Sequence, residues 1–167
     1  GVGTVFVNTS SGEMYVCTNA TEGSNVWTNF GDGTGNVEPY IFGGSSYGFC
    51  ATGRIGGTNY PDIDRYSFTS DGAGSNVGDA SNTNIQIPAG AQSSTHGYIL
   101  GGFNHPSTYF DTIDKFSFST LGTASDIGNL TQSKRYCAGQ SSATYGYCTG
   151  GSTPTRLDVI DKVSFSS

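Results

Sequence analysis

Two histidines, His96 and His105, are the first residues to weigh for acid–base or metal chemistry in this chain. A catalytic or metal-binding histidine usually lies near carboxylates or cysteines. His96 takes a position that Tyr47 and Tyr145 hold in two similar segments, which indicates a structural turn residue. His105 precedes Pro106 in a loop of variable length, where we expect a solvated side chain. The sequence therefore predicts no catalytic residue, no metal site, no cofactor and no enzymatic activity.

The four cysteines, Cys17, Cys50, Cys137 and Cys148, include no Cys-x-x-Cys pair, which argues against a zinc site. A hairpin turn centred on Ser142-Ala143 would place Cys137 directly opposite Cys148. Such a pair forms either a cross-strand disulfide or two buried thiols. We expect thiols by default, because a free cysteine packs as a small apolar residue.

Two glycine-rich segments could be read as ligand loops. The segment Asp71-Gly72-Ala73-Gly74-Ser75-Asn76 carries oxygen atoms that could hold calcium, but its spacing does not match a known calcium loop. A turn is therefore the main expectation there, and calcium binding stays open. The segment Gly31 to Gly35 lacks the lysine and the following helix of a phosphate loop, which favours a linker.

Asp64, Asp114 and Asp161 stand at the same place in three similar segments, each directly before an arginine or lysine. Three carboxylates could suggest catalysis. A catalytic site is needed only once, however, whereas this aspartate recurs in every segment. We therefore expect each of them to accept hydrogen bonds from a turn or a neighbouring strand.

The aspartates belong to a repeat with a period of 49 residues, marked by Gly48, Gly97 and Gly146. In each copy an aromatic residue follows the glycine, and in the last two copies a Gly-Gly pair comes shortly after. After a variable loop comes an alternating strand pattern such as Ile113-Asp114-Lys115-Phe116-Ser117-Phe118. Because a fixed period marks a repeat architecture, the sequence predicts an all-β fold with four short strands per copy.

The expected strands follow from these blocks. The glycine–aromatic strand should end at the Gly-Gly pair, and a further strand at Tyr136–Gly139 should lead into the last copy. In the alternating segment, Ile113 and Phe116 face opposite ways, and the pattern does not say which face is the core. No stretch shows the period of a helix.

Composition and charge limit the classes of protein. The chain has 167 residues with 26 glycines, 13% aromatic and 12% charged residues, and a net charge of −6. A nucleic-acid partner would need a basic patch, which this chain lacks, so we expect no binding to nucleic acid. No apolar run approaches the about 20 residues of a membrane helix, so we expect no membrane insertion. Gly1 is not an initiator methionine and the chain stops after a repeat motif, so we expect a piece of a longer protein.

The order of the blocks in the last copy resembles a kelch repeat, as shown by Arg135, Ala138, Gly146-Tyr147, Gly150-Gly151 and Ile160 to Phe165. The chain departs from kelch at its only tryptophan, Trp27, which lies outside the repeats. The resemblance implies kelch-like β-propeller blades over residues 40–167, about two and a half units of an incomplete ring. An incomplete ring exposes strand edges, so we expect more chain or neighbouring subunits to complete it.

Three strings, at residues 92–98, 113–119 and 126–133, resemble degenerate kelch-like arrays in virion structural proteins of marine bacteriophages. Residues 1–31 resemble the small β modules of phage fibres. They predict a small β-meander module with strands at Thr4–Asn8, Met14–Cys17 and Val26–Thr28 and a turn at Ser10-Ser11-Gly12. Residues 32–39 would be a Gly-rich linker.

The resemblance implies a structural component of a phage virion, in a tail, fibre or surface appendage, with other virion proteins or copies of itself as partners. The loops after Gly-Gly in kelch-like blades lie on one face, here Arg54 to Asp62, Phe103 to Thr112 and Ser152 to Val159. Host-surface carbohydrate would bind there, because aromatic and polar groups suit sugars. The candidate binding residues are Tyr60, His105, Tyr109, Phe110 and Arg156.

Two alternatives to a virion protein stay open. One is a secreted or cellular kelch-type protein-interaction module. The other is a carbohydrate-active propeller enzyme such as an oxidase, which would need clustered Tyr and His ligands that two scattered histidines do not provide.

Overall fold

The computed structural model describes residues 1–9, 12–30 and 46–166. Strands account for 56% of these residues and none of them is helical, so no helix that could cross a membrane occurs among them. The chain is all-β, with several small antiparallel sheets and no closed barrel in the described part. It divides into two compact units, residues 1–41 and residues 42–167, which we call the N-terminal part and the repeat part.

The N-terminal part contains one sheet with the strand order β1-β2-β3. Its strands are β1 (Val5–Val7), β2 (Met14–Asn19) and β3 (Val26–Asn29). Tyr15 and Cys17 are buried, and the ring of Phe6 lies 6.2 Å from that of Tyr15 and 6.3 Å from that of Trp27. The expected linker at residues 32–39 and part of the expected turn at Ser10-Ser11-Gly12 lie outside the described residues.

The described residues of the repeat part form three main sheets, of which only the second has the predicted four strands. The first sheet has β4 (Tyr47–Ile55), β5 (Thr58–Ser67) and β6 (Ser75–Asp79) in that order. The second sheet has the order β10-β9-β8-β7, from β7 (Ala89–Gln92), β8 (His96–Asn104), β9 (Thr108–Ser117) and β10 (Ser125–Asn129). The third sheet is formed by β11 (Ala138–Ser141), β12 (Tyr145–Thr149) and β15 (Ile160–Ser164), while β13 (Ser152–Thr153) pairs with β14 (Thr155–Arg156) and forms a single bridge, from Ser152 to Arg135.

The three sheets share one pairing register. Gly48 pairs with Tyr66, Gly97 with Phe116 and Gly146 with Val163. The repeated aspartates pair in the same way, Asp64 with Cys50, Asp114 with Ile99 and Asp161 with Cys148. The period of 49 residues in the sequence is therefore also a period of strand pairing.

The prediction that the glycine–aromatic strand ends at Gly-Gly is wrong for the second sheet. There β8 continues through Gly101 and Gly102 to Asn104, with a register shift between Leu100 and Gly102. Both glycines have positive φ, 63° and 130°, so the pair forms a bulge that bends the strand without ending it. In the third sheet β12 does end at Thr149, directly before its Gly-Gly pair.

Two apolar clusters hold the sheets of the repeat part together. One joins the first and second sheets through Ile63, Ala80, Ile85, Ile99, Phe116 and Ala124. The other joins the second and third sheets through Ala89, Ala91, Tyr98, Leu100, Ile113, Leu130, Cys148 and Val163. Ile113 and Phe116 thus point to opposite faces and are both buried, because the second sheet has a neighbour on each side.

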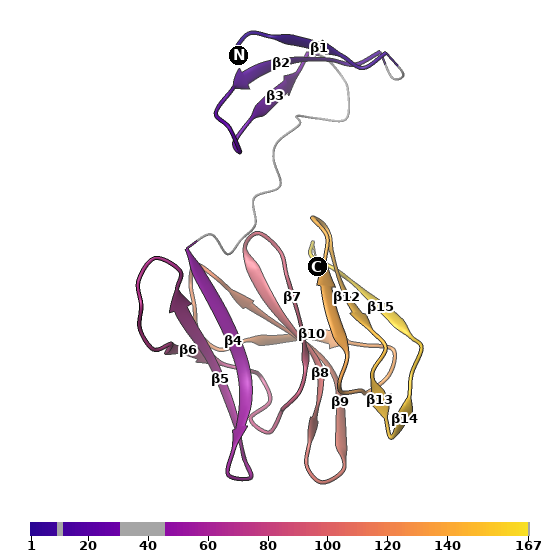
Figure 1. Ribbon diagram of the computed structural model, residues 1–167. Helices are drawn as coiled ribbons and strands as arrows, with labels where there is room; N and C mark the ends of the chain where they lie inside the picture. The colour runs from indigo at the N-terminus through magenta and orange to yellow at the C-terminus, as the bar shows by residue number, and fades with distance from the viewer. Residues whose placement is uncertain (10–11, 31–45, 167) are drawn as a thin grey trace. The chain divides into compact units, whose positions relative to one another are not determined.

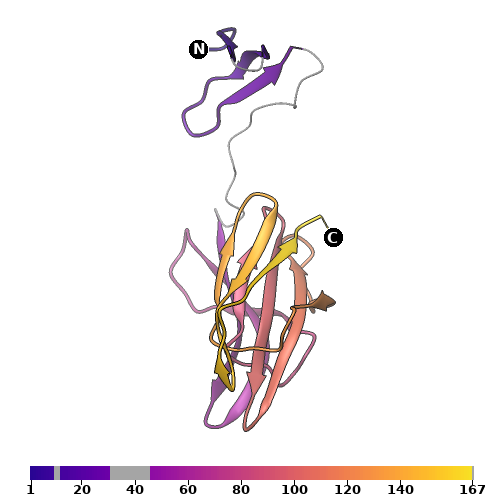
Figure 2. The same ribbon diagram turned by 90° about the vertical axis from the view of Figure 1, so that its right-hand side faces the viewer.

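The hairpins β4–β5, β8–β9 and β13–β14 all point toward the same end of the repeat part, as Figures 1 and 2 show. We call this the hairpin end. The turns between β7 and β8 and between β11 and β12 lie at the opposite end (Figure 1).

Candidate functional site

The five candidate binding residues lie on the hairpins rather than in irregular loops. Tyr60 is in β5, Tyr109 and Phe110 are in β9, Arg156 is in β14, and His105 is in the turn between β8 and β9. The expectation of loops is therefore wrong for most of these residues. Their segments continue the strand ladders beyond the Gly-Gly position, with Tyr60 opposite Gly53 and Tyr109 opposite Phe103.

Tyr109 is part of a cluster around the guanidinium group of Arg135, which we call the Arg135 cluster. The guanidinium carbon lies 3.9 Å from the ring centroid of Phe103, 5.3 Å from that of Tyr109 and 4.8 Å from that of Tyr136. The rings of Phe103 and Tyr109 are themselves 4.9 Å apart. Arg135 is half-buried and Tyr136 is 60% exposed, so the cluster opens to solvent on the side of Tyr136. Cation–π attraction holds the guanidinium in place.

Arg156 lies beside this cluster. The backbone of Arg135 exchanges two hydrogen bonds with Ser152, at 3.2 and 2.9 Å, and Ser152 in turn pairs with Arg156. Neighbouring strands are about 4.8 Å apart, so the backbones of Arg135 and Arg156 are about 10 Å apart. Directly paired residues point to the same face of a ladder, and the two arginines therefore share one face.

Of the five candidates, Tyr109 belongs to the Arg135 cluster, and Arg156 lies two strands away from Arg135 through Ser152. Tyr60 lies on the hairpin of the first sheet, and Phe110 packs against the apolar cluster between the first and second sheets. His105 lies in the β8–β9 turn. These three residues do not belong to the Arg135 cluster.

Arg135 has no anionic partner within the described residues. No ion pair or side-chain hydrogen bond of Arg135 occurs among them, and its Nε atom is buried without an acceptor. Three aromatic rings surround a guanidinium whose N–H donors are not used by the described part of the chain. Such a group can bind an external anion through two parallel hydrogen bonds.

Arg135, Phe103 and Tyr136 were not among the residues that the sequence pattern marked as binding residues. A signal for two of them exists where the repeat copies differ. The residues 49 positions before Arg135 and Tyr136 are Gln86 and Ile87, so a neutral pair is replaced by a cation and an aromatic. The contribution of Phe103 requires the packing of the second sheet on the third and has no local signal.

Two of the three repeated aspartates, Asp114 and Asp161, accept hydrogen bonds from the preceding sheet as expected, whereas Asp64 accepts none among the described residues. Asp114 is bonded by the backbone N–H of Ser81 at 2.8 Å and by its hydroxyl at 2.6 Å, and Asp161 by the N–H of Thr131 at 2.9 Å. Ser81 follows β6 and Thr131 follows β10, so each carboxylate joins its own sheet to the sheet before it. Asp114 and Asp161 are both buried.

A buried ion pair joins the second and third sheets. The Nζ atom of Lys134 lies 2.5 Å from Oδ2 of Asp161 and donates to the carbonyl of Cys148 at 3.3 Å. Burial acts to raise the pKa of Asp161, but the hydrogen bonds from Lys134 and Thr131 outweigh it, so this pKa lies below its usual value. Lys134 stands 49 residues after Ile85, which fills the same place between the first and second sheets.

Cys137 and Cys148 are free thiols that do not pair directly across their hairpin. The register places Cys148 opposite Gly139, because the turn is centred on Ala143-Thr144 and not on Ser142-Ala143 as predicted. The two thiols are hydrogen-bonded to each other, which lowers the pKa of Cys137 to about 7 and raises that of the buried Cys148. The default expectation of two thiols is thus confirmed, whereas the predicted direct pairing is wrong.

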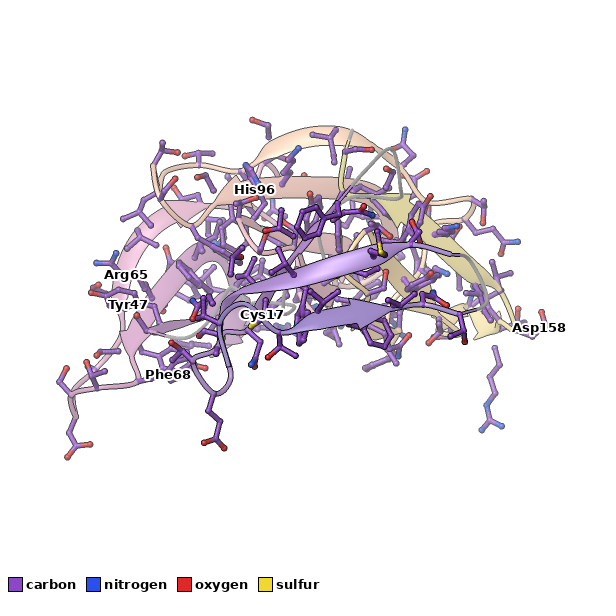
Figure 3. All side chains as sticks on the ribbon, turned by 90° about the horizontal axis from the view of Figure 1, so that it is seen from above. Cys17, Tyr47, Arg65, Phe68, His96 and Asp158 are labelled. Atoms are coloured by element: carbon purple, nitrogen blue, oxygen red, sulfur yellow. The ribbon has the colours of Figure 1, made fainter. Side chains whose placement is uncertain are left out.

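The lysine or arginine after each aspartate lies near the residue that begins the neighbouring strand. Arg65 lies 4.4 Å from the ring of Tyr47 (Figure 3), and Lys162 lies 3.6 Å from that of Tyr145. In the second sheet His96 stands where the other two sheets have this tyrosine, and its pKa is lowered by burial and by the charge of Lys115. His96 also bonds Thr95 through Nδ1 at 2.8 Å, as expected for a structural residue.

The outer face of the first sheet, on the side of Asp64, is uncovered. Tyr66 is 42% exposed, whereas Phe116 at the corresponding position of the second sheet is 7% exposed between two sheets. Phe68 and Cys50 on the same face are also exposed. We call Cys50, Asp64, Tyr66 and Phe68 the open face; Figure 3 shows where Phe68 lies.

Two further segments could carry a functional site, one with the spacing of a hydrolase motif and one with possible calcium ligands. Gly44-Ser45-Ser46-Tyr47-Gly48 fits Gly-x-Ser-x-Gly, but Ser46 leads directly into β4, whereas a hydrolase nucleophile lies on a strand-to-helix turn. The segment Asp71–Asn76 leads into β6. No group of three or more His, Cys, Asp or Glu in the described part of the chain is placed to hold a metal ion.

Comparison of the sequence with protein-family models and with curated proteins found no match. The hairpin end and the open face are the surfaces that indicate a function.

Proposed function

We propose that the chain is a structural component of a phage virion, in a tail, fibre or surface appendage. In this proposal the three sheets of the repeat part are kelch-like propeller blades. Their common register, their face-to-face packing and the buried aspartate between successive sheets support this interpretation. Propellers stack four-stranded sheets in this manner around a channel.

The open face is the observation that carries the assembly part of the proposal. Phe116 and Asp114 are buried by the preceding sheet, whereas Tyr66 and Asp64 at the corresponding positions have no sheet over them among the described residues. On the opposite side, Ile160 of the third sheet is exposed where Ile113 of the second is buried. Such apolar faces favour further blades or neighbouring subunits, as in a virion assembly.

The hairpin end supports attachment to host-surface carbohydrate as the second part of the proposal. Its three hairpins carry Tyr60, Tyr109 and Arg156, and the Arg135 cluster opens to solvent there. Aromatic rings with polar tips bind sugars by stacking and hydrogen bonding.

A kelch-type protein-interaction module, secreted or cellular, is the second candidate. The open face favours it equally, because a partner protein could cover the same apolar residues. The location of the protein distinguishes the two candidates.

Sedimentation velocity tests the assembly part. We expect the purified chain to self-associate and Phe68→Asp on the open face to weaken this association. Ile55→Asp, which places the same charge on an exposed apolar residue at the tip of the β4–β5 hairpin, is the matched control. A chain that stays monomeric at all concentrations would exclude association through copies of itself.

Immunogold electron microscopy tests the virion location. Antibodies raised against the purified chain are applied to virions concentrated from the source of the gene. Label on tails or fibres is the expected result. Label confined to cells or to soluble material would contradict the virion proposal and favour the interaction module.

A further inference from the structure

We propose that the Arg135 cluster, together with Arg156, binds the carboxylate group of an acidic sugar residue. This inference rests on the carbohydrate-attachment part of the proposed function, for which it names the site and the class of ligand. Arg135 binds the carboxylate, Tyr136 stacks on the sugar ring and Arg156 binds the next acidic group.

The free guanidinium of Arg135 is the first argument. The chain has 13 Asp and Glu for 7 Lys and Arg, so carboxylates are in excess. The adjacent Lys134 is paired with Asp161, yet Arg135 has no carboxylate among the described residues and stacks on Phe103 instead. A ring over the guanidinium face leaves the in-plane N–H donors directed away from the ring, where they match the two oxygens of a carboxylate.

The exposure of Tyr136 is the second argument. Its φ of 57° is uncommon for a bulky residue, and Ile87 in the preceding copy has nearly the same value, 55°. The backbone conformation therefore belongs to the repeat, and the change from isoleucine to tyrosine is specific to this copy. The result is a ring that is 60% exposed and lies beside the guanidinium, as a stacking platform for a sugar requires.

The position of Arg156 is the third argument. It shares one face with Arg135, with Ser152 paired between them. Arg156 is exposed, and no carboxylate within the described residues pairs with it. Two unpaired cations about two strand spacings apart favour a ligand with more than one carboxylate, such as an acidic oligosaccharide, over a single small anion.

The site occurs once in the repeat part. Gln86, Ile87 and Phe103 stand where the next copy has Arg135, Tyr136 and Ser152. Residues that hold the sheets together, such as the aspartates, recur in every copy. The residues of the Arg135 cluster do not, which favours a ligand over a structural requirement of the fold.

The test is a titration of the chain, followed by the NMR spectrum of its amide groups, with α-1,4-linked trigalacturonate. Galactotriose of the same linkage is the matched neutral ligand, because it lacks only the carboxylates. Arg135→Gln and Tyr136→Ile restore the residues of the preceding copy and are therefore compatible with the fold. We expect each to weaken trigalacturonate binding about tenfold, as for the loss of one charge-assisted contact. Lys162→Gln in β15, which removes an exposed cation outside the three hairpins, is the control variant, and we expect no effect.

The outcomes separate this inference from the proposed function. Binding of galactotriose as tight as that of trigalacturonate would overturn the acidic-sugar assignment and leave carbohydrate attachment in place. Binding of neither ligand would overturn the inference, and the assembly and virion tests would still stand by themselves. Equal losses in Arg135→Gln and Lys162→Gln would show that the site is elsewhere. Tighter binding of a hexa-aspartate peptide would identify an acidic protein segment as the partner instead.

Discussion

Ser81 donates two hydrogen bonds to the buried carboxylate of Asp114, one from its backbone N–H at 2.8 Å and one from its hydroxyl at 2.6 Å. Ser81 follows the last strand of the first sheet, and Asp114 lies in β9 of the second. Thr131 and Asp161 repeat this arrangement between the second and third sheets. The aspartate that recurs along the sequence is thus the polar contact through which successive sheets pack.

Replacing Asp114 should therefore destabilise the repeat part more than replacing Asp64. Asp114→Ala removes, at a fully buried position, the acceptor of both Ser81 donors, which costs about 1–3 kcal/mol. Asp64→Ala removes the same residue from the open face and should change the free energy of unfolding by less than about 0.5 kcal/mol. Urea unfolding of both variants is followed by circular dichroism. Tryptophan fluorescence is not suitable, because the only tryptophan, Trp27, lies in the N-terminal part and not in the repeat part. Equal losses would contradict the role of the aspartate between sheets.

Lys134→Ile should destabilise the repeat part less than Lys134→Ala. Both variants leave Asp161 buried without its cation, a loss of about 3–5 kcal/mol, and alanine opens a cavity as well. Isoleucine copies Ile85 of the first interface, where Asp114 is held by Ser81 without a lysine. Because isoleucine fills the space of the lysine stem, its loss of unfolding free energy should be about 2 kcal/mol smaller than that of alanine. An equal loss of both variants in urea unfolding would contradict the equivalence of Lys134 and Ile85.

The depressed pKa of Asp161 should make stability depend on pH in the acid range. Because the folded chain holds this carboxylate charged below its usual pKa, the stabilisation is complete above about pH 4, the ordinary titration range of aspartate. It is lost as the pH falls through the folded-state pKa. Asp161→Asn should flatten the decline of the unfolding free energy below about pH 4, and Asp64→Asn is the control. Parallel declines in the natural chain and in Asp161→Asn would contradict the prediction.

The sequence predicts much of the fold because the repeat is marked by residues with strong backbone preferences. The alternation from Ile113 to Phe118 falls in and directly after β9, and the expected hydrogen bonds form at Asp114 and Asp161. The turn predicted for the third sheet is wrong by one residue. Nothing in Ser142-Ala143-Thr144 resembles a two-residue turn sequence, and it is the Ser142 hydroxyl, which accepts the N–H groups of Thr144 and Tyr145, that fixes the turn.

The Arg135 cluster could not be derived from local sequence. Phe103 and Tyr109 come from the hairpin of the second sheet, whereas Arg135 and Tyr136 precede the third. These residues contact one another only because the two sheets pack together and because β8 continues through the bulge at Gly101 and Gly102 to Phe103. A comparison of repeat copies position by position shows the change from Gln86 to Arg135, but not what surrounds it.

Cys137 should be the reactive thiol of its pair. The hydrogen bond from Cys148 stabilises its thiolate and lowers its pKa to about 7. The rate of alkylation by iodoacetamide should therefore rise with a midpoint near that pH, read for each cysteine by peptide mass spectrometry. Cys148→Ala removes the donor and should move the midpoint toward the ordinary cysteine value of about 8.5. A midpoint that does not move would show that Cys148 is not the cause.

The last prediction concerns Gly97, which lies against the ring of Phe116. A Cβ atom at Gly97 would come 2.2 Å from that ring, whereas at Gly146 the nearest atoms, from Ala91 and Phe165, are 3.0 Å away. Gly97→Ala should therefore cost about 1–3 kcal/mol, as overpacking does. Gly146→Ala should cost less, because Val163 and not a ring stands across the strand from Gly146.

A second substitution separates this clash from a general intolerance of side chains at Gly97. Phe116→Val copies the third sheet, where Val163 faces Gly146. Alone it leaves a cavity and destabilises the fold. In the double variant Gly97→Ala with Phe116→Val the new methyl group enters the space that the ring has left, so the loss of unfolding free energy should be smaller than the sum of the two single losses. Additive losses in urea unfolding would mean that Gly97 is required for its backbone freedom and not by the ring of Phe116.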